Sequence, residues 1–149
     1  KGVKVVLNPA PACSLPESLF QHLYMITPNR IEAEMLTGVK INSKKDVAVA
    51  ADVLYRKGVK NIIITLGGEG SFVREGEKTC YIDACKVVPV DTTAAGDTFN
   101  GAVCVGVSEG MSLEQAVLFA SKASSISVTR MGAQSSIPYR KELDINNLV

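Results

Sequence analysis

Residues Asn61-Ile-Ile-Ile-Thr-Leu66 carry the clearest fold signal in this sequence. Three consecutive β-branched apolar residues predict a strand that is buried on both faces, as in a parallel sheet covered by helices. The glycine loop Gly67-Gly-Glu-Gly70 follows directly, and a hairpin around Glu75-Gly76-Glu77 comes next. The segment therefore predicts an α/β sheet with one antiparallel edge.

The same alternation of strands and helices extends over the rest of the chain. Apolar runs predict strands at 3–7, 24–27, 71–74, 78–82 and 86–90. Capping residues and glycines predict helices at 16–23, between Asn29 and Gly38, between Ser43 and Gly58, from Gly96 to near Gly110, from Ser112 to about Ser127, and at the C-terminus. This order predicts a mostly parallel sheet flanked by helices.

Composition restricts the class of protein. The chain has 149 residues, is 46% hydrophobic and has a formal net charge of +1, which suits one compact domain over residues 1–149. The balanced charge predicts no nucleic-acid partner and no binding to a membrane surface. The apolar runs are too short for a transmembrane span, and no signal segment follows Lys1.

The cysteines and the single histidine predict no catalytic or metal role of their own. Cys13, Cys80, Cys85 and Cys104 lack paired spacing, so we expect reduced, mostly buried thiols in a cytoplasmic protein. We expect His22 at the surface or at a helix end. The chain has no P-loop and no GxGxxG motif. Residues 106–110 match GxSxG, but they lie where a helix is expected to end, so the match is taken as chance.

The turn from Asp91 to Asp97 is the strongest candidate for a reactive site. A strand is expected to deliver the chain to Asp91, and the small residues 94–96 then begin a helix. The first N–H groups of a helix have no partner within it and, with the helix dipole, attract an anion such as phosphate. Asp97 would repel that anion unless it faces a hydroxyl that attacks it. Alternatively, Asp91 and Asp97 simply cap the helix, and the residues alone leave both interpretations open.

Several segments, in order, resemble the ribokinase (PfkB-type) sugar kinase family. Asp91-Thr-Thr-Ala-Ala-Gly-Asp-Thr-Phe-Asn-Gly-Ala102 is similar to the family signature. The supporting segments are Asn8-Pro-Ala-Pro-Ala12, Pro28-Asn-Arg-Ile-Glu-Ala-Glu34, Leu36-Thr-Gly38, Ile64-Thr-Leu-Gly67 and Ser127-Val-Thr-Arg-Met-Gly-Ala-Gln134. The resemblance implies a ribokinase-like, Rossmann-like fold. It also implies that this chain is the C-terminal, nucleotide-binding and catalytic part of such a kinase.

The resemblance also implies the roles of individual residues. Asp97 would be the general base and would contact the sugar, with an anion hole at Ala94, Ala95 and Gly96. The ATP-binding residues would be Asn29, Thr65, Leu66, Gly67, Gly68, Glu69, Gly70, Gly96, Asp97 and Ser121. Glu32 would hold Mg²⁺ indirectly, although Asn29 and Glu32 also read as a capping box. A monovalent cation, K⁺, would lie at Asp91, Thr93, Ser127, Arg130, Gly132 and Ser136, largely on backbone oxygens. The wider family usually has Gly in place of Ala94, and relatives often have His or Asn in place of Ser121.

The implied activity is ATP-dependent phosphorylation of D-ribose at its 5-hydroxyl, with Mg²⁺ and K⁺, by a cytoplasmic homodimer. Two alternatives remain open: a related kinase acting on fructose, a nucleoside or another sugar, and a nucleotide-binding chain without complete catalytic machinery. A dinucleotide-dependent oxidoreductase is disfavoured, because the glycine fingerprint is absent. If the chain begins within a larger sheet, we expect an open edge or an exposed apolar face at 3–7.

Overall fold

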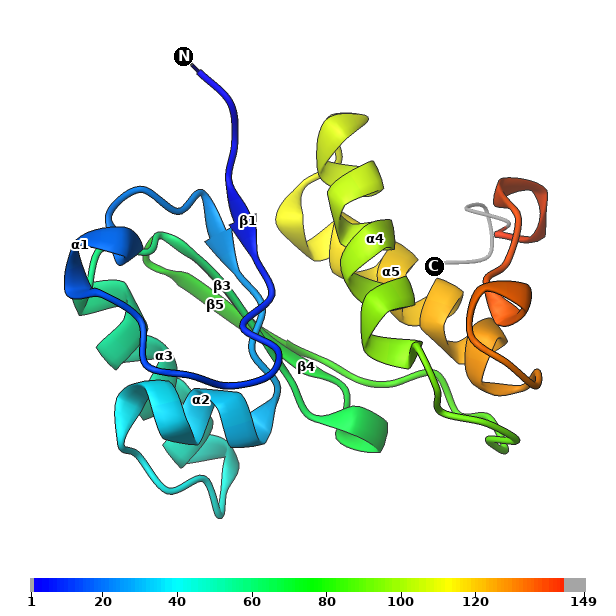
Figure 1. The fold of residues 1–149 in the computed structure, drawn as a ribbon, viewed down its shortest axis with the longest axis horizontal. Coiled ribbons are helices and arrows are strands. Elements are labelled where there is room, and N and C mark those ends of the chain that lie inside the picture. The colour runs from blue at the N-terminus through cyan, green and yellow to red at the C-terminus, as the bar shows by residue number, and fades with distance from the viewer. Residues whose placement is uncertain (1, 144–149) are drawn as a thin grey trace. The chain divides into compact units, whose positions relative to one another are not determined.

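A computed structural model describes residues 2–143, and these residues form an α/β fold that divides into two compact units. The first unit runs from Lys1 to Tyr81 and the second from Ile82 to Val149. Each unit has its own architecture (Figure 1). They are therefore described separately.

The first unit is built on a mixed sheet whose strands follow one another in sequence order. Its strands are β1 (Val6–Leu7), β2 (Met25–Ile26), β3 (Asn61–Thr65), β4 (Ser71–Glu75) and β5 (Lys78–Ile82). β1, β2 and β3 are parallel, whereas β4 runs antiparallel to β3. The sequence predicted both the parallel pairing and the antiparallel hairpin, and both are confirmed.

β3 is the buried strand that the sequence indicated. Ile62, Ile63 and Ile64 are all 0% exposed, although adjacent side chains of a strand point to opposite faces. Both faces of the sheet are therefore covered at this strand. Figure 1 shows helices α2 (Arg30–Thr37) and α3 (Lys44–Arg56) together on one face of the sheet.

Helices α2 and α3 lie between the capping residues that the sequence indicated, whereas the helix predicted at 16–23 is limited to Glu17–Phe20. Asn29 caps α2, which ends at Gly38 in the left-handed conformation, and the Ser43 side chain accepts a hydrogen bond from the N–H of Asp46 at the start of α3. Leu54 of α3 and Phe20 of the short helix α1 (Glu17–Phe20) join the buried core of this unit.

Two helices lie side by side in the second unit. They are α4 (Ala95–Ser108) and α5 (Leu113–Val128), and short 3₁₀ turns follow at Gln134–Ser136 and Arg140–Glu142. Ser112 and Gln115 form the expected capping box at the start of α5. Gly106 lies inside α4, so the GxSxG match forms no nucleophile turn.

Two strand predictions need correction. Residues 86–90 form no strand and are exposed, because Pro89 has no N–H to donate and no described strand pairs with them. The strand predicted at 3–7 is limited to Val6–Leu7. Among the described residues it lies at the edge of the sheet, and Val3 is 79% exposed, which agrees with the expected open edge.

The environment of the cysteines differs from the prediction. Cys13, Cys85 and Cys104 are exposed and Cys80 is half-buried, so the expectation of mostly buried thiols is wrong. Spacing alone does not reveal which face of a helix or loop a cysteine occupies. His22 is exposed, as expected. Within residues 2–143, no helix combines the length and apolarity that crossing a bilayer requires.

Candidate active site

The turn before α4 has an unusual backbone at Ala94. Its φ is 58°, and it is the one non-glycine residue with positive φ among the described residues. A side chain in this left-handed region costs about 1–2 kcal/mol, and such strain collects at functional sites. The conformation also explains why glycine suits this position. The turn therefore holds a defined, costly shape rather than a relaxed helix cap.

Within residues 94–97, the strained turn leaves the backbone N–H groups of Ala94, Gly96 and Asp97 without an acceptor among the described residues. The N–H of Ala95 donates to Thr92 O at 3.2 Å, and that of Thr98 donates to Ala94 O at 2.9 Å. Between them, the N–H groups of Gly96 and Asp97 have no acceptor among the described residues. Because Gly96 carries no side chain and is exposed, an anion can approach both donors. The N–H of Ala95 is already bonded to Thr92 O, so Ala95 does not donate to an anion here. Its small side chain leaves space for one.

Asp97 supplies one of these donors from the first turn of α4, and its side chain is exposed. No protein cation forms an ion pair with it among the described residues. An exposed carboxylate beside unused N–H donors can accept a proton from a hydroxyl while the donors bind an anion. This arrangement is chemically suited to transfer of an anionic group to an alcohol.

Asp91 joins two loops of the second unit. Its Oδ1 accepts the N–H of Thr93 at 2.9 Å, and its Oδ2 accepts the N–H of Gly132 at 2.9 Å. The Thr93 hydroxyl and these N–H groups lower the pKa of Asp91. A carboxylate held in the charged form beside two loops fits a monovalent cation chemically.

The structure links the predicted cation ligands in two groups: Asp91 contacts Thr93 and Gly132, and Ser127 contacts Ser136 and accepts the Arg130 N–H at 3.0 Å through its carbonyl. The hydroxyls of Ser127 and Ser136 lie 2.8 Å apart. The Arg130 side chain is engaged elsewhere, since its Nη2 pairs with Glu142 Oε1 at 2.5 Å. This pairing raises the pKa of Arg130 and lowers that of Glu142.

Val128 is a structural link that sequence reasoning missed. Its carbonyl accepts the N–H of Val90 at 2.7 Å and that of Asp91 at 3.1 Å. The contact uses only backbone atoms, so no residue type in the sequence could have revealed it. It fixes the end of α5 against the approach to the 91–97 turn. Ser121, predicted near the nucleotide base, is a half-buried residue within α5.

In the first unit, the predicted nucleotide residues follow two adjacent parallel strands. Asn29 comes after β2 and forms a parallel bridge with Thr65 at the end of β3, where the N–H of Thr65 donates to Pro28 O at 3.0 Å. The carboxyl ends of parallel strands are where open α/β sheets bind ligands. The sequence therefore identified two segments that lie side by side at this edge.

Asn29 and Glu32 form a complete capping box. Asn29 Oδ1 accepts the N–H of Glu32 at 2.9 Å, and Glu32 Oε2 accepts the N–H of Asn29 at 2.8 Å. Glu32 is 6% exposed, whereas Asn29 is exposed. The structural role of this pair is thus confirmed, and the exposed Asn29 is the member positioned to meet a ligand.

The loop after β3 is a tight turn that depends on glycine. Gly67 and Gly70 have φ of 60° and 94°, and Leu66 N–H donates to Gly70 O at 2.8 Å. Gly67, Gly68 and Glu69 are exposed, whereas Leu66 is buried. Arg30 at the start of α2 pairs with Glu69 across this loop at 2.5 Å.

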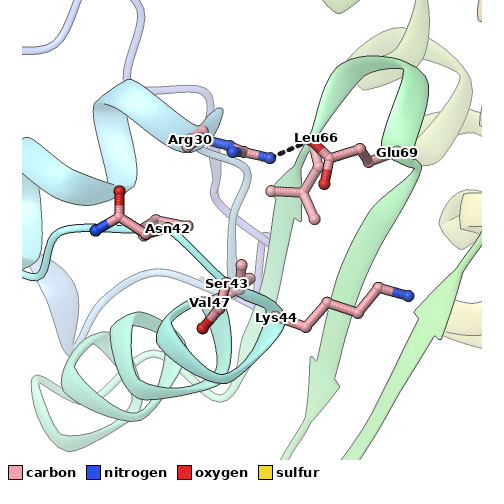
Figure 2. Close-up of a pocket in the computed structure, with 8 residues that line it drawn as sticks. Arg30, Asn42, Ser43, Lys44, Val47, Leu66 and Glu69 are labelled. Carbon is pink, nitrogen blue, oxygen red and sulfur yellow. Dashed lines mark hydrogen bonds and ion pairs between the residues drawn. The ribbon is translucent and has the colours of Figure 1, made fainter.

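A small polar pocket lies next to this loop (Figure 2). Figure 2 shows the Arg30–Glu69 pair at one side and Lys44 on another element, with Asn42 pointing away from them. The pocket is lined by Arg30, Ile41, Asn42, Ser43, Lys44, Val47, Leu66 and Glu69. Leu66 and Glu69 alone belong to the predicted nucleotide residues, so the pocket borders the predicted site without containing it.

The comparisons with known proteins identify the family of this chain. The model of the pfkB family of carbohydrate kinases matches residues 1–140, and the chain belongs to this family. It is 48% identical to the ribokinase of Haemophilus influenzae over 95% of this chain and 46% of that protein. The chain spans about half the length of the curated relatives it matches.

Solved structures show the same fold. A ribokinase from Thermotoga maritima matches with a TM-score of 0.88 and 42% identity, over 99% of this chain and 49% of the other. A ribokinase from Arabidopsis thaliana, complexed with ribose and ATP, matches with a TM-score of 0.91 and 33% identity, over 99% and 47%. The chain is therefore similar throughout to one half of these kinases.

Proposed function

We propose that this chain supplies the nucleotide-binding and catalytic C-terminal part of an ATP-dependent kinase that phosphorylates D-ribose at its 5-hydroxyl. The observation that carries the proposal is the 94–97 turn. There, the unused N–H groups of Gly96 and Asp97 lie next to the exposed Asp97 carboxylate. The family match and the similarity to ribokinases support the choice of reaction and of sugar.

The proposed chemistry divides the work between the backbone and one carboxylate. The N–H groups of Gly96 and Asp97 stabilise the negative charge of the phosphoryl group in flight. Asp97 receives the proton of the attacking hydroxyl. Because phosphoryl transfer passes through a loose transition state, the hydroxyl loses its proton late, and a carboxylate of ordinary basicity suffices.

The nucleotide and two cations are assigned to residues whose chemistry suits them. Asn29 and the 65–70 loop would bind the phosphates of ATP, and Ser121 would lie near its base. Glu32 would act on Mg²⁺ indirectly, since Mg²⁺ is held mainly through water and phosphate. K⁺ would lie beside Asp91, with Thr93, Ser127, Arg130, Gly132 and Ser136 supplying mainly backbone oxygens. Its charge would offset the carboxylates near the phosphoryl group.

The sugar pocket would depend mostly on residues outside this chain, because the matched ribokinases are about twice as long. We also infer a homodimer for the longer enzyme and a cytoplasmic location. The free thiols of Cys13, Cys85 and Cys104 fit a reducing compartment.

The test is a substrate panel with the full-length protein that contains this chain. With ATP and Mg²⁺, we expect D-ribose to give the highest kcat/KM among ribose, deoxyribose, fructose and nucleosides. Asp97→Asn should lower kcat by roughly 10²–10⁴-fold, the usual worth of general base catalysis, with the Kd for an ATP analogue nearly unchanged. A higher kcat/KM with fructose or a nucleoside than with ribose would refute ribose as the substrate. An active Asp97→Asn variant would refute the assignment of the base.

A further inference from the structure

A chain of buried hydroxyl groups connects α4 with the 130–136 loop in the second unit. Thr98 Oγ1 donates to Ser127 Oγ at 3.4 Å, and Ser127 Oγ lies 2.8 Å from Ser136 Oγ. Thr98 is 5% exposed, and Ser127 and Ser136 are 0% exposed. A buried hydroxyl without a hydrogen-bond partner destabilises the folded protein, because its desolvation is not compensated. These contacts therefore favour one relative position of α4, α5 and the 130–136 loop.

The chain of hydroxyls has a single direction. Ser136 Oγ donates to Ala133 O at 2.7 Å, which uses its only proton. Ser127 must then donate to Ser136, and its own oxygen accepts from Thr98. Each hydroxyl donates once, and the sequence of bonds ends on a carbonyl of the loop.

A second hydroxyl of α5 holds the same turn of α4. Ser124 Oγ donates to Ala95 O at 3.1 Å. Ser124 and Ser127 are one helical turn apart on α5, so they project from the same face. They contact α4 at Ala95 and at Thr98, on either side of the proposed donors at Gly96 and Asp97.

We propose that Thr98 and Ser127 are positioning residues, which hold the turn carrying Asp97 at a fixed place relative to the 130–136 loop. The inference rests on the proposed function, because the turn matters through the reaction it performs. Neither hydroxyl reaches solvent, so both act through the groups they orient. The hydroxyls thus keep the Asp97 carboxylate in a constant position relative to the 130–136 loop. If the turn is displaced, we expect kcat to fall while the affinity for the substrates stays the same.

The test compares variants that differ by one hydroxyl, in the full-length protein. Thr98→Val removes the hydroxyl and keeps the shape, whereas Thr98→Ser keeps the hydroxyl. Ser127→Ala removes the central hydroxyl of the three, and it replaces Thr98→Val as the test variant if Thr98→Val folds poorly. Ser125→Ala is the matched control, because Ser125 Oγ bonds to Lys122 O within α5 and adjoins Ser124 and Ser127 in sequence.

We expect Thr98→Val and Ser127→Ala to lower kcat by roughly ten- to hundredfold, while KM for ATP and sugar changes by less than about twofold. Thr98→Ser should recover most of the rate, and Ser125→Ala should match the wild type. Equal kcat in Thr98→Val and wild type would overturn the proposal. A rise in KM with kcat unchanged would overturn it too.

Hydrogen exchange separates this inference from the proposed function. In Thr98→Val we expect the amides of residue 98 and of Gly132 to exchange about tenfold faster, because the turn and the loop lose a shared anchor. Ser125→Ala should leave both rates unchanged. If the wild type phosphorylates no sugar, the proposed function fails, and the exchange rates still decide the anchoring. Unchanged exchange in Thr98→Val would show that the hydroxyl chain positions nothing.

Discussion

Asp91 Oδ2 accepts the backbone N–H of Gly132 at 2.9 Å, across 41 residues of sequence. The same carboxylate accepts the N–H of Thr93 through its other oxygen. One side chain therefore ties the turn before α4 to the loop after α5. Protonation turns one carboxyl oxygen into a donor and weakens the other as an acceptor. The double connection therefore depends on pH.

Asp91→Asn should weaken the second unit in a pH-dependent way. The folded protein lowers the pKa of Asp91 below its usual value of about 3.9, so the stabilisation is fully present above that pH. It is lost as the pH falls through the lowered pKa of the folded state. We expect the variant to melt a few degrees below wild type at pH 7, with the gap closing at low pH.

Thermal melts between pH 7 and pH 2 measure this difference. Asp83→Asn, which removes an exposed carboxylate of the same unit, is the control and should show no such trend. A melting gap for Asp91→Asn that is constant over the whole range would contradict the prediction.

Ala94→Gly should relieve backbone strain. Glycine adopts the φ of 58° without a steric penalty, although its unfolded state has more entropy. We expect the free energy of unfolding to rise by up to about 1 kcal/mol in urea titrations. Ala95→Gly, at a helical position of the same turn, should lower it by about 0.5–1 kcal/mol. Equal losses from both substitutions would mean that Ala94 is unstrained.

Gly106→Ala should separate α4 from α5. A Cβ at this position would lie 3.0 Å from Ala116 Cβ and 3.1 Å from Met111 Sδ. We expect a loss of about 1–3 kcal/mol of stability from overpacking.

Gly101→Ala is the matched control, because nothing lies within 4 Å of its added Cβ in the same helix. It should gain about 0.5–1 kcal/mol. Chemical denaturation of the two variants in parallel tests the contrast, and a stable Gly106→Ala protein would argue against the close helix contact.

Substitutions of Asn29 should separate its capping role from a role in binding nucleotide. Asn29→Ala removes the cap and should cost about 1 kcal/mol. Asn29→Asp keeps a capping oxygen and the stability, but adds negative charge where ATP phosphates are proposed to bind. We expect KM for ATP to rise roughly fivefold in Asn29→Asp, from charge repulsion of about 1 kcal/mol. An unchanged KM would leave Asn29 as a cap only.

Local signals predicted most of the fold. Asn29, Gly38 and Ser112 act within one or two helical turns, so their caps were readable from sequence. The run of isoleucines in β3 is also a local signal, and it predicted correctly that this strand is buried. The segment 86–90 has strand-forming residues too, but a strand needs a partner, and none of the described strands pairs with it.

The candidate site was predicted in part. Gly96 and Asp97 could be proposed from the chemistry of a helix start, whereas the nucleotide role of Asn29 came from the family resemblance and stays a prediction. The engagement of the Ala95 N–H, the Val128 carbonyl bonds and the Arg130–Glu142 pair depend on which loops meet in space. Backbone contacts between distant loops leave no residue pattern, so single-sequence reasoning could not find them.

The exposed thiols make the chain suitable for spectroscopic labelling. Cys13 lies in the first unit and Cys104 in the second, and both are exposed. Desolvation raises the pKa of Cys104, so dye attachment there calls for mildly alkaline buffer. Cys85→Ser removes the third exposed thiol, so that a donor and an acceptor dye can be attached to Cys13 and Cys104. Energy transfer between the dyes would then report whether adding nucleotide changes their separation.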